Sequence, residues 1–175
     1  MFSFFAKKMH HKPSKEGVRL LASILVCYEE ITKVSYDPGN ATMRLTFAVK
    51  EAVTKEDFQK FGQLVAESDA TYLSLNGIKS RILNLEMESV AQVTFLHLVR
   101  DVETLTRGEI SLVADLLYNK FPQTLILDER ENVDPNFEIE QENTLDRALV
   151  TVRQQHLSEK LLGIREGDHV VVYNQ

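Results

Sequence analysis

The sequence predicts a mixed α+β protein with one compact core and a short C-terminal appendage. Apolar residues alternate between helical and strand spacing from residue 15 to residue 127, and two helix-capping signals each follow a strand pattern. A strongly acidic segment then sets the C-terminal residues apart. At 175 residues, the chain can bury a sizeable core without disulfides or a structural metal.

The N-terminal part of this pattern predicts a helix followed by a β-hairpin. Apolar residues at helical spacing predict a helix over 15–31. The period changes to two in segments 32–36 and 41–49, and the sequence DPGN between them, residues 37–40, is typical of a tight turn. In the second strand every other residue is apolar, so we expect one face of that strand to meet water.

The middle of the chain predicts two further helices, each placed between strands. Thr54 and Asp57 approximate a helix-capping box, and Thr106 with Glu109 fits the S/T-x-x-E box directly. The predicted order is strand, helix, strand, strand, helix, strand, at 41–49, 54–75, 83–87, 90–99, 106–121 and 124–127. This is the order of ferredoxin-like domains, so we predict a ferredoxin-like βαββαβ core with an extra N-terminal helix and strand.

An acidic segment and a small C-terminal unit complete the predicted organisation. Between residues 128 and 146, eight acidic residues stand against a single arginine. The chain is therefore divided into a flexible N-terminus, an α/β core domain, an acidic linker and a C-terminal helix plus hairpin, at 1–14, 15–128, 129–142 and 143–175. Because the last unit is too small to fold alone, we expect it to dock on the core or on a second copy.

Cysteine content and hydropathy favour a cytoplasmic protein. Cys27 is the single cysteine, which excludes an internal disulfide and fits a reducing compartment. The longest apolar run, 20–28, is too short to cross a bilayer. The N-terminus places its apolar residues before its bases, the reverse of a secretory signal.

Few residues suggest catalysis. No nucleotide-binding, nucleophile-elbow or zinc-protease motif is present, and we predict no cofactor and no metal site. The best catalytic candidates are His97, Asp101 and Glu103 near the end of the 90–99 strand, because imidazole titrates near neutrality and carboxylates bind hard cations. However, His97 shares a strand face with apolar residues, where a histidine is more often a hydrogen-bonded core residue.

The first residues could contact a membrane surface. Phe2, Phe4 and Phe5 can insert into the interface of a bilayer, and Lys7 and Lys8 can meet anionic headgroups. The alternative is that these phenylalanines pack on the domain. The apolar area is small, so we expect weak association at most.

Nucleic acid is not an expected partner. The predicted water-facing strand residues include Glu86 and Glu88, and the net charge is −6. Residues 161–170, LLGIREGDHV, resemble the second hairpin of the swapped-hairpin transition-state-regulator family of DNA-binding proteins. That family's preceding strand, with glycine-arginine and isoleucine-proline signals, has no counterpart here, so DNA binding is not carried over.

These observations together predict a non-catalytic, cytoplasmic protein-interaction or regulatory module that can self-associate, for example as a homodimer. One alternative is a small enzyme or ligand-binding domain that uses the cluster of His97, Asp101 and Glu103. A further alternative is a weakly membrane-associated adaptor. The enzyme requires those three side chains to converge in a pocket, whereas the interaction module requires only a suitable surface.

Overall fold

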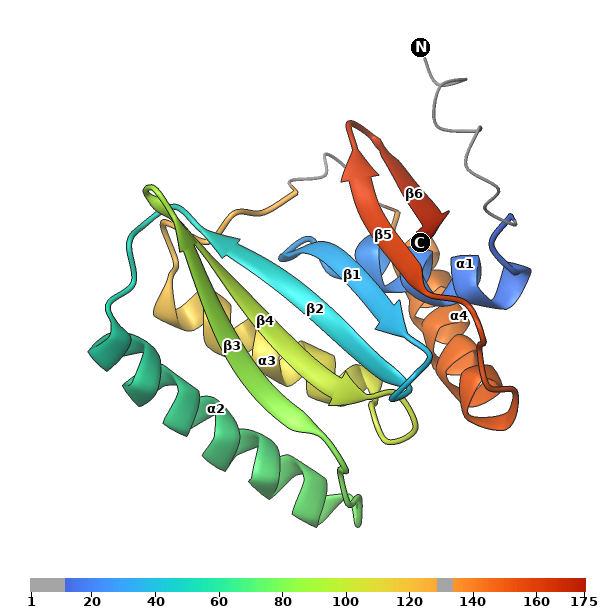
Figure 1. Ribbon diagram of the computed structural model, residues 1–175, viewed down its shortest axis with the longest axis horizontal. Helices are drawn as coiled ribbons and strands as arrows, with labels where there is room; N and C mark the ends of the chain where they lie inside the picture. The colour runs from blue at the N-terminus through green and yellow to red at the C-terminus, as the bar shows by residue number, and fades with distance from the viewer. Residues whose placement is uncertain (1–11, 129–133) are drawn as a thin grey trace.

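The computed structural model describes residues 12–128 and 134–175 as four helices and one six-stranded sheet (Figure 1). In chain order the elements are α1 (Lys15–Cys27), β1 (Ile31–Asp37), β2 (Thr42–Val49), α2 (Lys55–Leu75), β3 (Leu83–Val90), β4 (Val93–Asp101), α3 (Arg107–Lys120), α4 (Pro135–Gln154), β5 (Leu161–Glu166) and β6 (His169–Asn174). The predicted mixed α+β class is confirmed. Among the described residues, no helix combines the length and the apolar character that a membrane span needs.

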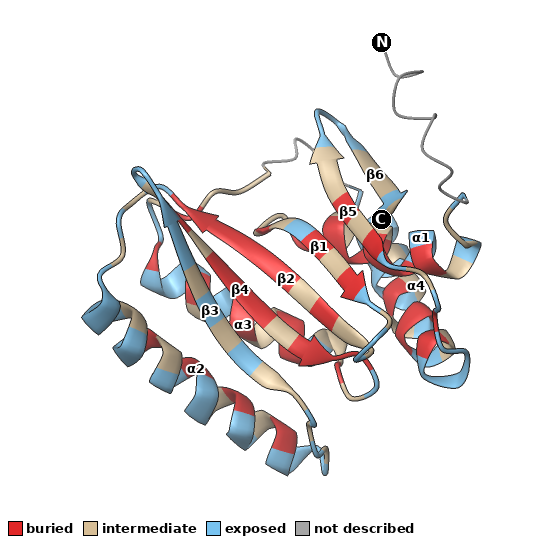
Figure 2. Ribbon diagram, viewed as in Figure 1, coloured by how far each residue is buried: buried red, intermediate tan, exposed pale blue. Residues whose placement is uncertain are grey.

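The sheet is antiparallel throughout, with the strand order β3-β4-β2-β1-β5-β6. In Figure 1, α1, α3 and α4 lie behind the sheet and α2 runs alongside β3, while none of the described helices covers the face toward the viewer. Of the four inner strands, β2 and β4 are largely buried, and the two outer strands β3 and β6 are exposed or intermediate (Figure 2). The sheet therefore has one core face, one open face and two outer edges.

Local sequence explains where the helices begin. Each helix follows a residue whose side-chain oxygen accepts a backbone N–H from the first turn, and these residues are Ser14, Thr54, Thr106 and Asp134. Such a cap satisfies an N–H that the helix itself leaves unpaired and typically contributes about 1 kcal/mol. The two predicted capping signals thus lie at real helix starts. The first helix is shorter than expected, ending at Cys27, and β1 begins at Ile31.

The strand expected at 124–127 is not formed as a continuous strand. Leu125 makes an isolated antiparallel bridge with Val49, and the Ile126 N–H donates to the Ala48 carbonyl at 2.8 Å. The reason is that β1 already pairs with most of the β2 edge, from Ile31 to Asp37. The observed order β2, α2, β3, β4, α3 is compatible with a ferredoxin-like core, and that finer assignment stays a prediction.

The predicted acidic linker, 129–142, is helical from residue 135 onward. Residues 135–142 form the first turns of α4, and 129–133 lie outside the described residues. Asp134 Oδ1 accepts the Asn136 N–H at 2.9 Å, and Pro135 occupies the start of the helix, where its missing N–H costs nothing. Acidic side chains in a first turn are also favoured by the helix dipole. Capping and the helix dipole therefore favour a helix where the acidic composition suggested a linker.

The C-terminal unit docks on the core of the same chain. β5 pairs with β1, and α4 packs against α1, so Leu149 and Leu161 belong to the same hydrophobic core as Leu21. Tyr36 donates its hydroxyl to the Leu157 carbonyl at 3.1 Å. The hairpin is thereby built into the sheet and becomes one of its two outer edges.

Candidate interaction surface

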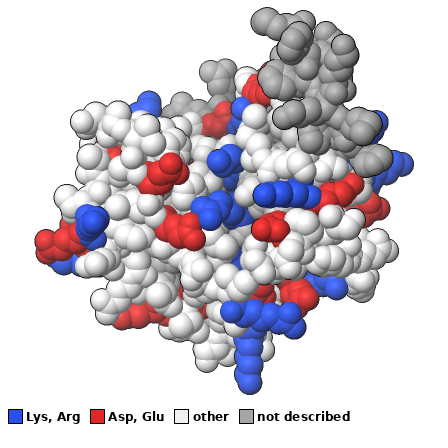
Figure 3. Space-filling model, in the orientation of Figure 1, with Lys and Arg blue, Asp and Glu red and all other residues white. Residues whose placement is uncertain are grey.

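The open face of the sheet changes character from one end to the other. Strand register places Glu86, His97, Thr46, Lys33 and Ile164 in one row from β3 to β5, and Val171 of β6 continues it. The β3 end is thus charged and the β6 end apolar. Acidic and basic side chains are interspersed over this side of the molecule (Figure 3), so no single-sign field marks it as a nucleic-acid surface.

His97 lies on this open face but is almost fully buried by its neighbours. Its Nδ1 is 2.9 Å from Thr46 Oγ1, and its Nε2 is 3.6 Å from Glu88 Oε2. Burial lowers the pKa of His97, and the positive charge of Arg44 lowers it further. The imidazole is therefore held neutral near pH 7 in a hydrogen-bonded position between two strands.

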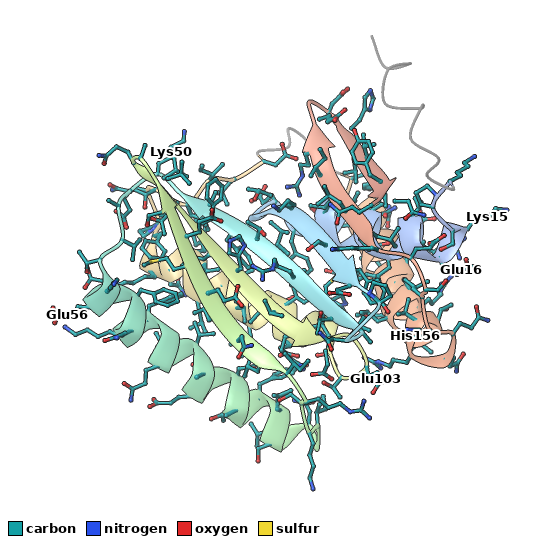
Figure 4. The ribbon with its side chains drawn as sticks, in the orientation of Figure 1. Lys15, Glu16, Lys50, Glu56, Glu103 and His156 are labelled. Atoms are coloured by element: carbon teal, nitrogen blue, oxygen red, sulfur yellow. The ribbon has the colours of Figure 1, made fainter. Side chains whose placement is uncertain are left out.

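The structure does not bring the three catalytic candidates together. Asp101 lies four residues beyond His97 on β4, about 13 Å along a strand, and its carboxylate accepts the N–H groups of Arg81 and Ile82 at 3.0 Å. Glu103 is exposed and pairs with Arg81 at 3.1 Å, and Figure 4 shows it at the far end of the sheet. His97, Asp101 and Glu103 therefore do not line a common pocket.

A buried ionic network lies behind the β3 half of the sheet and was not recognised from the sequence. Arg100 is fully buried and holds the fully buried Glu109 of α3 through two hydrogen bonds. It also donates to Asp101 and to the Ile82 carbonyl. Glu109 is the residue that suggested a capping box, but its carboxylate serves this ion pair. The sequence did contain a signal for this network. Arg100 lies two residues from Leu98 and from Val102, both of which are buried in the core, so an arginine at this position needs a buried partner.

Asp69 of α2 completes this network without a compensating cation of its own. It is fully buried, and neither of its oxygens has a donor from another group. Burial raises the pKa of Asp69 to about 7, with a further contribution from the negative charge of Glu109. A protonated Asp69 can donate to the Glu109 carboxylate, which satisfies both groups. The network therefore serves to lock α2 and α3 to the end of β4.

The outer edge of β3 is protected by charge. Its open-face residues include Glu86 and Glu88, and Glu86 forms an ion pair with Arg44 of β2 at 2.9 Å. Charged side chains on an edge strand disfavour pairing with another chain, because pairing would desolvate them. This edge has the features of a surface that stays in water.

The outer edge of β6 has the opposite character. Its sequence, HVVVYN, contains three consecutive valines and a tyrosine, with no lysine, glutamate or proline. Valine and tyrosine are strong strand formers, and an unprotected apolar edge strand is a template for pairing. Within the described part of the chain, the sheet ends at this strand.

The backbone groups that β6 directs outward follow from the hairpin geometry. Glu166 and His169 close a two-residue turn in which Gly167 has φ of 65°, as a type II′ turn requires. The pair that closes a two-residue hairpin is hydrogen-bonded, and hydrogen-bonded pairs then recur at every second residue. The Gln175 N–H fits this alternation, since it donates to the Lys160 carbonyl at 2.7 Å. The odd-numbered residues therefore direct their N–H and C=O toward β5. Val170 and Val172 direct theirs toward the outer edge.

The helix beneath this edge adds an apolar stripe. Val18, Ala22 and Val26 recur every four residues on α1 and line a groove on its outer surface, with Lys15 and Arg19 at the rim. Val18 is 38% exposed. Lys15 points away from the body of the protein at the start of α1 (Figure 4). Gln141 and Thr144 of α4 also line this groove, and Val26 at the end of the stripe lies beside Val170 of β6.

One hollow elsewhere has polar walls. It lies between the end of α1, α3 and α4, has a volume of about 420 Å³, and is lined by Tyr28, Glu30, Asp115 and Glu142 among others. Burial raises the pKa of Glu30. Across the described ranges, no three histidine, cysteine or acidic side chains are grouped as a metal would need. These walls carry no recognisable ligand chemistry.

The proposed membrane residues, Phe2, Phe4, Phe5, Lys7 and Lys8, lie outside the described residues. Comparison of the chain with protein-family models, with curated proteins and with solved structures gives no match. Function must therefore be inferred from the chain's own residues, and the strongest contrast on its surface is between the β3 and β6 edges.

Proposed function

We propose that this protein is a non-catalytic interaction module that binds a protein partner by adding a strand at the β6 edge. The observation that carries the proposal is the uncharged run of Val170, Val171, Val172 and Tyr173 on an outer strand of the sheet. Strand addition provides main-chain hydrogen bonds for affinity and side-chain contacts for specificity.

The rest of the molecule supports an interaction role over catalysis. His97, the buried histidine of the sheet, is held neutral between Thr46 and Glu88. The buried carboxylates of Asp101 and Glu109 are engaged by Arg100. A ferredoxin-like core, a cytoplasmic location and a regulatory or assembly role fit this proposal.

A pair of matched substitutions tests the proposal. Val171→Lys places a charge on the open face of β6, and Val90→Lys places the same charge on the open face of β3, where the valine is already 54% exposed. We expect Val171→Lys to abolish self-association, measured by sedimentation velocity. It should also abolish the binding of host proteins to the immobilised protein. The reason is that a lysine at the edge must be desolvated on pairing. Val90→Lys should behave as the wild type.

Circular dichroism and urea denaturation check that both variants fold. Equal behaviour of the two variants, whether both associate or neither does, would contradict the proposal, because the β6 edge would then have no special role. If only Val90→Lys loses association, the interaction surface is the β3 edge and the proposal is wrong.

A further inference from the structure

We propose that the β6 edge pairs with the β6 edge of a second copy of this chain, antiparallel and centred on Val171, so that the two sheets join into one. This inference rests on the proposed function and specifies its partner. The pairing is two-fold symmetric, as expected for a homodimer with a single self-complementary surface.

The first argument is the register of side chains. Centring the pair on Val171 places Val170 of one copy opposite Val172 of the other and Val171 opposite itself. Val170 and Val172 direct their N–H and C=O groups outward, so they form the hydrogen-bonded pairs, and Val171 forms a non-hydrogen-bonded pair. Every cross-strand pair in the centre is then valine on valine, a combination that packs well in sheets. If one strand shifted by one residue, the outward N–H and C=O groups of Val170 would lie opposite Val171, whose own groups point toward β5, and the hydrogen bonds would be lost.

The second argument is the direction of α1 beneath the hairpin. The start of α1, at Gly17, lies against Leu161, and its end, at Val26, lies beside Val170. α1 therefore runs antiparallel to β6. When two β6 strands pair antiparallel, the two α1 helices also become antiparallel neighbours, two to three strand spacings or about 10 to 14 Å apart.

The third argument is the distribution of charge along the edge. Three exposed bases, Lys12, Lys15 and Lys160, lie where β6 ends, together with two half-buried acids, Glu16 and Glu159. The exposed acids Glu166 and Asp168 lie where β6 begins. Antiparallel pairing brings the acidic end of each copy to the basic end of the other, twice in the dimer. An unrelated partner would need both a valine-rich strand and this reversed order of charges, and a second copy supplies both.

Disulfide trapping tests this geometry. Residues in a non-hydrogen-bonded antiparallel pair have Cα atoms about 4.5 Å apart, which falls within the range that a disulfide spans. In a Cys27→Ala background, Val171→Cys should form a covalent dimer nearly completely on mild oxidation with diamide. Val90→Cys in the same background is the control and should remain monomeric on a non-reducing gel. Sedimentation equilibrium of the wild type should give twice the mass of 20.0 kDa.

The outcomes separate this inference from the proposed function. A wild type that stays monomeric up to millimolar concentration would overturn the second-copy partner, and the proposed function would survive if host proteins still bind in a manner sensitive to Val171→Lys. A dimer that Val171→Cys fails to trap would overturn the β6 pairing. Equal trapping of Val90→Cys and Val171→Cys would overturn it as well, because random collisions would explain both.

Discussion

The two outer edges of the same sheet differ in how they meet water and in what anchors them. β3 carries glutamates on its open face and is anchored from behind by the buried charges of Arg100, Glu109 and Asp69. β6 carries valines, and its hairpin is anchored by Arg165, which donates to the Tyr28 carbonyl at 2.7 Å. One edge is protected against association by charge, whereas the strand at the other edge carries no lysine, glutamate or proline.

Each half of the sheet is held by one arginine, and the two arginines, Arg100 and Arg165, bind different groups. Arg100 neutralises buried carboxylates, so its removal leaves charges in the core. Arg165 also reaches the Leu25 and Ile31 carbonyls and pairs with Asp128 at 2.9 Å, so it satisfies the end of α1 and the start of β1. The first arginine fixes helices to the core, and the second fixes the proposed interaction edge.

The largest expected effect comes from breaking the β3 anchor. Arg100→Met should lower the free energy of unfolding by about 3 to 5 kcal/mol, because Glu109 and Asp101 would stay buried without their cation. Urea denaturation measures this. Arg44→Met, which removes the exposed ion pair with Glu86, is the control and should cost less than about 1 kcal/mol. Similar losses for both variants would show that the buried network contributes no special stability.

Breaking the β6 anchor should have a smaller effect. Arg165→Met should cost about 1 to 3 kcal/mol, because carbonyls that Arg165 now satisfies at the end of α1 would lose their donor. Hydrogen exchange should show faster exchange of β5 and β6 amides, with β3 and β4 unchanged. Uniform acceleration over the whole sheet would mean that the hairpin does not open independently of the core.

The buried carboxyl of Asp69 should give the β3 half a pH dependence that extends to neutral pH. Its pKa is raised to about 7 in the folded protein by burial and by Glu109, so in the window between about 4 and 7 the folded state holds a proton that the unfolded state has lost. Stability from this group therefore falls as pH rises through that window, by at most about 1.4 kcal/mol per unit.

Asp69→Asn removes this proton and isolates its effect from that of His97, which titrates in both proteins. The urea midpoints of the wild type and the variant should be measured from pH 5 to pH 8. The stability of the wild type relative to the variant should fall as the pH rises, so the variant is relatively more stable at the higher pH. Parallel curves would contradict the assignment of a shared proton to Asp69 and Glu109.

The smallest expected effect concerns charges at the ends of the β6 edge. Asp168→Lys should weaken the dimer about two- to fivefold, the range for an exposed ion pair. Asp168 would lie opposite Asn174 of the second copy, and Lys160 of that copy lies near the same end on the adjacent strand β5. Adding Lys160→Asp to the same chain should restore the dissociation constant by swapping the charges. If the double variant binds more weakly than Asp168→Lys, these two residues do not meet across the interface.

The sequence alone determined the local elements and one face of the sheet. The caps at Thr54 and Thr106 begin α2 and α3, because an N-cap depends only on residues three apart. The alternation in 41–49 correctly assigns Arg44 to the open side and Leu45 to the core, since side chains on a strand alternate in direction. These features are short-range, so the chain encodes them without knowledge of the fold.

Tertiary structure decided which distant residues share a partner. β1 occupies the β2 edge that 124–127 was expected to use, and β5 takes the next place, because pairing depends on which strand reaches an edge with a matching apolar face. Arg100, Asp69 and Glu109 come from three elements, and no local spacing relates them. Their burial, and the place of the β6 valines at an outer edge of the sheet, follow from long-range packing, which single-sequence periodicity does not contain.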